Sequence, residues 1–325
     1  MRSSVLTELW DTTRMRLLVE IERRGSLSAA AREVGIGQPS ASQHLRLLEA
    51  AAGHRLVERN GRGSRLTEAG RVLAGHAAQA LGTLGAADEE LAALAGLQTG
   101  TIHLGASTAP GVYLLPGTLG CFRSDYPGVT VEVEIAASAD ILRRLLGGRI
   151  QLAIVGSERA DERIALEPFL EDEIVGVAKP GLLKLARGAL EPSLMGELTL
   201  LARERDSSSR QIADQELAAA GAKPAGVWEF GSSEAIKRGV GEGLGVAFLS
   251  RYAVMDEVAR GELETFRLAG RLPMRRQFSI ARLAGRPFSP AELGFVATLT
   301  RCCAKSVEFA QACVGNSRSY SSPSK

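Results

Sequence analysis

The stretch from residue 26 to residue 70 constrains the fold of this chain more than any other stretch. Residues 26–34 have the composition of a short helix, Gly35-Ile36-Gly37 forms a break, and residues 38–49 predict a second helix. Two short helices joined by a turn of three or four residues that contains glycine make a helix-turn-helix motif. In that motif the second helix enters the major groove of DNA, and its N-terminal residues touch base edges. The stretch therefore predicts a DNA-binding unit.

The residue types at the helix ends support this interpretation. The hydroxyl of Ser26 or Ser28 can satisfy a free backbone N–H at the start of the first helix. Pro39 falls in the first turn of the second helix, where its missing N–H costs nothing. The alternative is an ordinary three-helix core with a polar outer face, since residues 15–21 add an upstream helix. The residues expected to meet DNA on the second helix are Gln38, Pro39, Ser40, Ser42, Gln43 and Arg46.

Residues 55–67 predict a basic hairpin. Two short alternating runs flank Asn60-Gly61, a strong signal for a tight hairpin turn. Arginine binds phosphate through two parallel hydrogen bonds and keeps its charge, so a wing of this kind can reach the DNA backbone or the minor groove. Arg62 and Arg65 are the expected wing contacts. The alternative is a solvated hairpin whose charges serve only solubility.

The order and spacing of these segments resemble those of the LysR-type transcriptional regulators. The resemblance implies an α/β fold class with an N-terminal winged helix-turn-helix, a long linker helix and a two-subdomain, periplasmic-binding-protein-like effector domain. Val57 stands where the family usually has Phe, which alters the packing of the wing. Gln43 stands where many members have Arg, which changes the expected base contact. The resemblance rests on four ungapped runs, residues 25–31, 38–45, 55–59 and 66–70.

Positive charge is concentrated at the N-terminal end. Residues 1–70 contain eleven arginines and eight acidic residues, a net charge of +3, whereas the whole chain of 325 residues has +2. A small basic domain on a neutral body suits a protein that meets DNA with one end. The chain has neither an apolar run long enough to span a membrane nor an N-terminal secretory signal. We therefore expect a cytoplasmic protein without a membrane partner.

A long helix is expected from residue 68 to about residue 97, capped by Thr67. Its apolar residues have coiled-coil-like spacing, and Gly75, Gly82 and Gly85 each weaken the helix by roughly 1 kcal/mol relative to alanine. A second copy of the helix would bury the seam, and the resemblance implies that this linker makes a homodimer or homotetramer. The alternative is a helix packed on its own domain. The seam consists of Leu73, Ala77, Leu81, Leu84, Leu91 and Leu94.

Beyond Gly100 the pattern changes to alternating strands and helices, which predicts a parallel sheet covered by helices. Strands are expected at residues 101–106, 129–134, 152–155, 173–178, 198–202, 227–230, 246–249 and 276–281, and helices at 112–124 and 138–146. The expected units are a winged domain (1–67), a linker helix (68–98), an effector domain (99–310) with crossovers near 176–180 and 264–272, and a polar tail (311–325).

The effector site is expected at the carboxyl ends of the strands, where ligands bind in open α/β sheets. Hydroxyls beside helix N-termini, followed by an arginine, can hold an anion. We therefore expect a small anionic metabolite as the effector, although simple helix capping would also explain these serines. The expected effector-binding residues are Ser107, Thr108, Ser157, Ser207, Ser208, Ser209 and Arg210.

Neither catalytic residues nor a metal or cofactor site emerge from the remaining motifs. The glycines of residues 239–245 come after a helix and before a strand, the reverse of the order in a dinucleotide loop. The four cysteines have no metal-binding spacing, and Glu171, Asp172 and Glu173 are interpreted as solvated. The hypothesis is a DNA-binding transcriptional regulator, not an enzyme, whose partners are promoter DNA, an effector and RNA polymerase. A solute-binding protein and an enzyme with a two-subdomain cleft are the alternatives.

Overall fold

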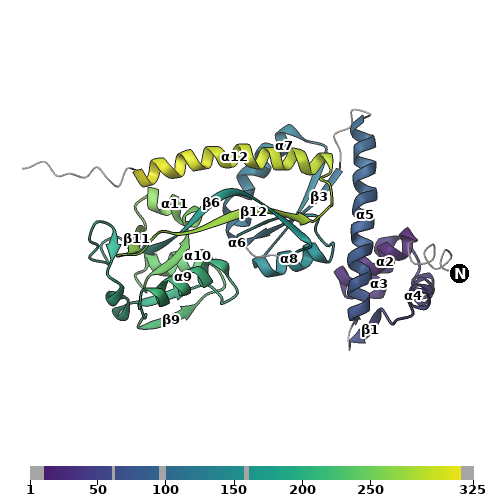
Figure 1. Cartoon of the computed structure of the whole chain (residues 1–325), viewed down its shortest axis with the longest axis horizontal. Coiled ribbons are helices and arrows are strands. Elements are labelled where there is room, and N and C mark those ends of the chain that lie inside the picture. Colours follow the sequence, from purple (N-terminus) through teal and green to yellow (C-terminus); the bar gives the residue numbers. More distant parts are fainter. Residues whose placement is uncertain (1–10, 61–62, 95–99, 157–160, 316–325) are drawn as a thin grey trace, which may run out of the picture.

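The computed structural model describes residues 11–60, 63–94, 100–156 and 161–315. Figure 1 shows three parts: a small N-terminal domain, one long helix beside it, and a larger α/β body that ends in a second long helix. This arrangement is the one predicted, a winged helix-turn-helix followed by a linker helix and an effector domain of two subdomains. Among the described residues, no helix is both long enough and apolar enough to cross a membrane.

The N-terminal domain contains the helix-turn-helix. Helix α2 (Thr12–Arg24) lies across α3 (Leu27–Val34) and α4 (Gln38–Ala52), and each of the three ends at a glycine in the left-handed conformation. The Ser26 hydroxyl accepts a hydrogen bond from the Ala29 amide at 3.4 Å, as a helix cap should. The fully buried side chains of Leu17, Leu18 and Ile21 fill the core between the helices. The predicted helix-turn-helix is confirmed.

The wing is a hairpin of β1 (Val57–Asn60) and β2 (Gly63–Leu66), antiparallel as predicted. Its base is fixed to the helices in two ways. Glu49 accepts hydrogen bonds from the Leu56 and Val57 amides at 2.9 and 3.3 Å. The Ser64 amide donates to the Gly25 carbonyl at 2.8 Å. These hydrogen bonds therefore fix the position of the wing relative to the second helix of the motif.

The linker helix is α5 (Glu68–Leu94), and Thr67 caps it as expected, accepting from the Gly70 amide at 3.0 Å. The predicted apolar seam has two different environments. Leu73 packs on the winged domain and Ala77 is buried. Leu84 and Leu91 are 51% and 65% exposed. The first half of the seam thus packs within the chain, whereas the second half is open to a partner.

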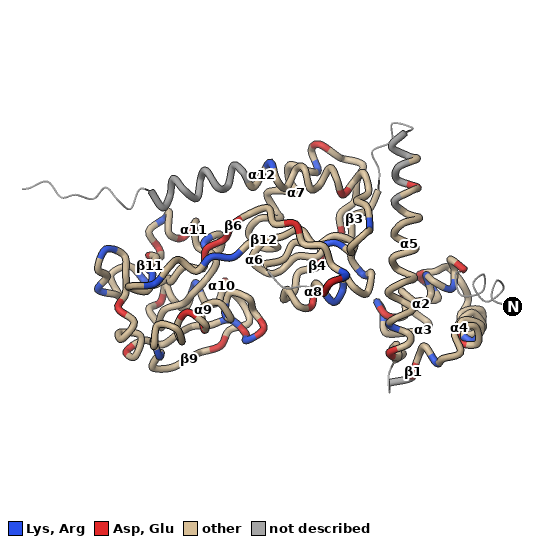
Figure 2. The backbone as a smooth tube through the Cα atoms, viewed as in Figure 1, with Lys and Arg blue, Asp and Glu red and all other residues tan. Residues whose placement is uncertain are grey.

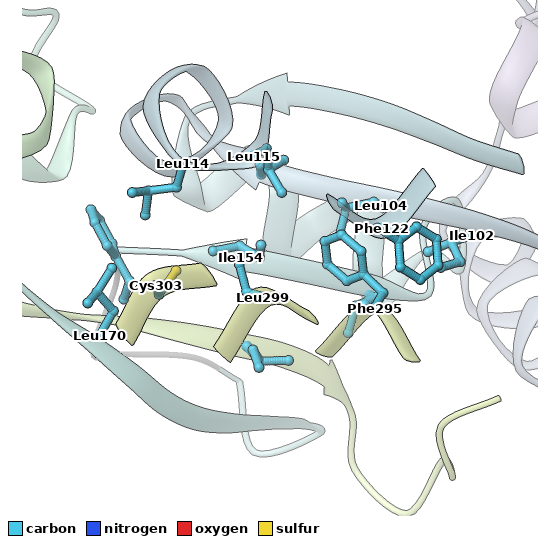
Figure 3. Packing of buried hydrophobic residues seen from close by; sticks show 14 of the residues in the cluster. Ile102, Leu104, Leu114, Leu115, Phe122, Ile154, Leu170, Phe295, Leu299 and Cys303 are labelled. Carbon is cyan, nitrogen blue, oxygen red and sulfur yellow. The ribbon is translucent and has the colours of Figure 1, made fainter. Parts of the chain in front are cut away.

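Subdomain I begins with β3 (Gly100–Ser107), which pairs in parallel with β4 (Val129–Ala136) and β5 (Leu152–Val155). Helix α8 (Ser138–Leu146) agrees with the prediction to the residue. The single helix predicted for residues 112–124 is instead two, α6 (Thr108–Tyr113) and α7 (Leu115–Asp125), with Pro116 in the first turn of α7. The C-terminal helix α12 (Pro290–Gly315) packs on α7, and its Phe295 ring meets Phe122 edge-on at 5.5 Å (Figure 3).

Subdomain II lies between two long strands, β6 (Ile164–Ala178) and β12 (Met274–Leu283). It begins with a short strand, β7 (Ala189–Leu190), a 3-10 helix, η1 (Pro192–Glu197), and a strand, β8 (Thr199–Ala202). Next come helix α9 (Ser208–Ala219), strand β9 (Gly226–Glu229) and helix α10 (Ser233–Gly241). It ends with β10 (Ala247–Ser250), α11 (Arg251–Ala259) and β11 (Glu264–Leu268).

The expectation of a parallel sheet is wrong for the middle of this body. Strand β12 is antiparallel to both β5 and β6, and β10 and β11 are antiparallel to β6. The reason is that β6 carries the chain into subdomain II and β12 brings it back, so the two neighbouring strands run in opposite directions. The segments 176–180 and 264–272, where we expect the crossovers, meet where β11 pairs with β6.

A substitution at Gly70 tests how closely the linker helix packs against the chain at the base of the wing. A Cβ atom at this position would lie 2.1 Å from the carbonyl oxygen of Leu56, which is backbone and cannot yield. We expect Gly70→Ala to lower the free energy of unfolding of the winged domain by about 1–3 kcal/mol, the usual cost of overpacking. Urea titration followed by circular dichroism measures this change.

Gly85→Ala is the matched control on the same helix, because a Cβ atom there would meet nothing within 4 Å. It should raise stability slightly, since alanine favours helix by about 1 kcal/mol over glycine. Equal effects of the two substitutions would contradict the close approach at Gly70.

Candidate DNA-binding surface and effector cleft

The N-terminal half of α4 presents polar side chains to solvent. Gln38, Pro39, Ser40, Gln43 and Arg46 are exposed and Ser42 is half-buried. Ala41, buried completely, holds this end of the helix against the core. Glutamine can bind an adenine edge through two hydrogen bonds, and serine can bind either base edges or phosphate. The helix therefore has the groups that reading a major groove requires.

Two exposed arginines of this surface have no carboxylate partner among the described residues. Among the described residues, exposed Arg46 on α4 and Arg65 on β2 take part in no ion pair. Arg23 and Arg24, in the last turn of α2, are paired with Glu20. An unpaired guanidinium is free to bind phosphate. Arg62, the other expected wing contact, lies outside the described residues.

A second candidate site lies between the subdomains. The first strand of subdomain I ends at Ser107, and α9 of subdomain II begins at Ser208, so both carboxyl-end loops reach one small cavity. Five predicted residues line it: Ser107, Thr108, Ser207, Ser208 and Ser209. Two predictions have another outcome. Arg210 is not among the lining residues and instead binds Asp214 at 2.7 Å, and Ser157 lies outside the described residues.

One wall of the cavity is Arg276, half of a buried ion pair that our sequence analysis missed. Arg276 of β12 and Asp172 of β6 are register partners, 4% and 0% exposed, and Arg276 Nε donates to Asp172 Oδ2 at 2.8 Å. Ser250 donates to the other carboxylate oxygen at 2.8 Å, and Arg276 Nη1 donates to Ser208 at 2.6 Å. The interpretation of Asp172 as solvated is therefore wrong, because this side of β6 faces the interior.

Burial and the neighbouring groups have opposite effects on the pKa of Asp172. Burial raises the pKa of Asp172, and Arg276 and Ser250 offset only part of that effect. Arg276 Nη2 lies 2.8 Å from Asp172 but, within the described part of the chain, makes no hydrogen bond of good geometry. One buried guanidinium donor is thus left for another acceptor. Buried donors are normally satisfied, so a free one beside a cavity indicates a ligand or a bound water.

Arg203, Glu204 and Ser233 also line the cavity. Buried Arg203 binds Glu204 and donates to the Ser233 hydroxyl at 2.9 Å. Across the cleft, the Tyr113 hydroxyl of α6 donates to Glu234 of α10 at 2.7 Å. Burial and this hydrogen bond both raise the pKa of Tyr113, which keeps its hydroxyl proton in place. A direct bond therefore joins the two subdomains beside the pocket.

The cavity is small in this conformation, about 30 Å³. A cavity of this size has room for roughly two water molecules, at about 10–15 Å³ for each. A metabolite of several heavy atoms requires the two subdomains to move apart. Within the described part of the chain, including this cavity, no group of three or more His, Cys, Asp or Glu side chains could hold a metal ion.

Comparison with known proteins assigns both domains to one family. Residues 12–71 match the bacterial regulatory helix-turn-helix of the lysR family, and residues 95–304 match the LysR substrate binding domain. The regulator CbbR of Rhodospirillum rubrum is 31% identical over 293 residues, 89% of this chain and 96% of its own length.

Two solved structures show related folds. A full-length OxyR variant from Pseudomonas aeruginosa, 21% identical, has a TM-score of 0.72 over 90% of this chain and 94% of its own. The regulatory domain of Synechocystis CcmR in complex with 2-PG, 25% identical, has a TM-score of 0.57 over 62% of this chain and 96% of its own. With both family domains matched in order across most of its length, the chain belongs to the LysR-type transcriptional regulators, a family of DNA-binding proteins and not of enzymes.

Proposed function

We propose that this LysR-type regulator senses a small anionic metabolite in the cleft between its subdomains and alters transcription of its target genes in response. The observation that carries the proposal is Arg276, a buried guanidinium with one unused donor beside the cavity. An N–H donor of a guanidinium beside serine hydroxyls favours a carboxylate, phosphate or sulfate over a neutral ligand.

The relatives support an anion as well. The CcmR regulatory domain was solved in complex with 2-PG, and it matches 62% of this chain. Since a metabolite does not fit the closed cavity, binding has to favour a more open arrangement. A ligand shifts such an equilibrium by its difference in affinity for the two states. The effector then changes how the subunits present their DNA-binding domains.

The protein acts, in this proposal, in the cytoplasm as a homodimer or homotetramer on promoter DNA, with RNA polymerase as a further partner. The exposed Leu84 and Leu91 of α5 support pairing through the linker helix. The functional units are a winged domain (1–67), a linker helix (68–98), an effector domain (99–310) and a tail (311–325). The second helix of the motif reads bases, and the wing contacts the backbone.

Arg65 tests the wing. We expect Arg65→Ala to weaken binding to specific and random duplexes alike and to reduce the slope of log affinity against log salt by about one unit. The reason is that one phosphate contact, with its released counterion, is lost. Fluorescence anisotropy with a duplex from upstream of the gene, titrated with salt, measures the slope. Arg123→Ala, an exposed arginine on α7, is the control and should leave the slope unchanged; an unchanged slope for Arg65→Ala would count against the wing contact.

Ser42 tests base reading. Ser42→Ala should cost about 1–3 kcal/mol of discrimination between the specific and a random duplex, the usual value of one good base contact. Competition anisotropy with both duplexes measures it. Ser28→Ala, on the exposed face of α3, should affect the two duplexes equally. If Ser42→Ala also weakens both equally, Ser42 does not read bases.

A substitution at Arg276 tests whether the effector binds in the cavity between the subdomains. We expect 2-PG and sulfate to bind the wild-type chain in isothermal titration calorimetry, and Arg276→Lys to weaken that binding at least tenfold, or about 1.4 kcal/mol, because lysine keeps the charge but loses the planar fork. Arg210→Lys is the matched control, since Arg210 lies outside the cavity lining. Equal affinities for the two variants would place the anion elsewhere, and no binding by the wild type would refute these anions as ligands.

A further inference from the structure

One side chain of subdomain I reaches across the cleft and is bound by subdomain II. Tyr113 is the last residue of α6, and its hydroxyl donates to Glu234 of α10 at 2.7 Å. Figure 2 shows α6 and α10 next to each other at the boundary between the subdomains. The ring of Tyr113 packs against the buried core of each subdomain. Tyr113 therefore connects two bodies that must separate to admit an effector.

A buried lysine makes a second contact with the same ring. Lys237 of α10 has a side chain that is 7% exposed, and its Nζ lies 5.1 Å from the centroid of the Tyr113 ring. A cation over the face of an aromatic ring is attracted to it, more strongly where water is excluded. The same Nζ lies 2.8 Å from Glu234 and 2.8 Å from Glu257 of α11. Lys237 thus covers the tyrosine ring and positions the carboxylate that accepts the tyrosine hydrogen bond.

The carboxylate of Glu234 stays ionised in this arrangement. Burial raises its pKa, but the hydrogen bonds from Lys237 and Tyr113 have the larger combined effect, so the pKa lies below the ordinary value of a glutamate. A hydrogen bond to an ionised acceptor is roughly twice as strong as one between neutral groups. The bond between Tyr113 and Glu234 is therefore of the stronger kind.

The charged groups of subdomain II keep their partners when Tyr113 leaves. Glu234 and Glu257 belong to the same subdomain as Lys237, so the lysine retains its ion pairs in an open cleft. A buried charge without a partner would be costly, and this opening creates none. The Glu234 side chain is 55% exposed, so water can replace the tyrosine hydroxyl. The contact can therefore break and form again while both subdomains stay folded.

The two helices that Tyr113 joins also form walls of the small cavity. Ala109, in the first turn of α6, and Ser233, the first residue of α10, both line it. Glu234 follows Ser233 directly in the sequence. A wider cavity requires α6 and α10 to move apart, because each has a residue in the lining. The bond between Tyr113 and Glu234 opposes that movement.

We propose that Tyr113, Glu234 and Lys237 form a clasp that keeps the cleft closed in the free protein, and that effector binding has to break it. A ligand that binds only the open state has an apparent dissociation constant equal to the intrinsic one divided by the open fraction. The clasp therefore determines how much effector the regulator needs before it responds. This role in sensing rests on the proposed effector function, whereas the closure itself does not.

Distances between spin labels on the two subdomains test the closure without any ligand. Nitroxide labels replace Ser124, exposed on α7, and Gln215, exposed on α9, in a full-length chain whose four native cysteines are substituted. Labelled chains are diluted with unlabelled ones, so that pulsed electron spin resonance records only distances within one chain. Tyr113→Phe removes the hydroxyl and keeps the ring. We expect it to increase the fraction of longer distances at least about twofold, because the closed state loses a bond that the open state never had.

Tyr126→Phe is the matched control within subdomain I. Tyr126 is also half-buried, but its hydroxyl lies beside Gly294 of α12, so its removal should leave the distances unchanged. Tyr113→Phe combined with Glu234→Gln should open the cleft no more than the stronger single substitution, since both act on one bond. The closure is overturned by unchanged distances in Tyr113→Phe, by an equal change in Tyr126→Phe, or by additive effects of the two clasp substitutions.

Titration calorimetry with sulfate tests the role in sensing. Tyr113→Phe should bind sulfate at least about threefold more tightly than the parent chain, because a larger fraction of the protein is already open. Tyr126→Phe should bind it as the parent does. Equal affinities for Tyr113→Phe and the parent would overturn the role in sensing, even where the distances confirm the closure. Absence of binding by both sulfate and 2-PG in all three chains would refute the effector function, and the label distances would still decide the closure.

Discussion

The antiparallel pairing of β6 with β12 is the contact on which both subdomains depend. These strands pair from Ile164 to Ile174 on one side and from Met274 to Leu283 on the other, and each subdomain adds its own strands to one end of the pair. At the passage between the subdomains lies the Arg276–Asp172 ion pair, a direct cross-strand neighbour pair. Removing one partner of a buried ion pair costs about 3–5 kcal/mol, because the other charge is left without compensation. The strands that join the subdomains therefore also supply the charge of the cleft.

Arginine serves two purposes in this molecule, and its partners distinguish them. In the effector domain, the side chains of Arg203 and Arg286 are 7% and 9% exposed and bound to carboxylates, so they hold loops in place. On the DNA-binding surface, Arg46 and Arg65 are exposed without a carboxylate in the described structure. Net charge alone does not reveal this division.

Local signals predicted the elements that depend on local chemistry. The helix-turn-helix followed from serine, proline and glycine at fixed offsets, and α8 and β5 followed from short, clear patterns. The first part of β6 was missed because Pro168 interrupts it, and proline normally argues against a central strand. The structure accommodates Pro168 at an irregularity where the register shifts opposite Phe278 and Ser279.

The candidate cleft was predicted in part for the same reason. The rule that ligands bind at the carboxyl ends of strands located the serines. Arg276 and Asp172 are 104 residues apart in sequence, and nothing near either of them indicates the other. Arg210 lies outside the cavity lining and is paired with Asp214, one helical turn away, a local contact that the prediction did not consider. Sequence patterns do not predict an ion pair between two residues that only the tertiary fold brings together.

The place of α12 at the end of the chain has a consequence for biosynthesis. The core of subdomain I joins side chains of residues 102–170 with Phe278, Phe295 and Leu299 (Figure 3). The core of the winged domain lies entirely within residues 17–74. Because domains fold as units during synthesis, with N-terminal ones first, the winged domain can be complete while the ribosome is still producing subdomain II. Subdomain I must wait, with Ile102 and Phe122 uncovered, until the last helix emerges. A nascent regulator thus has a finished DNA-binding end well before it has a finished sensor.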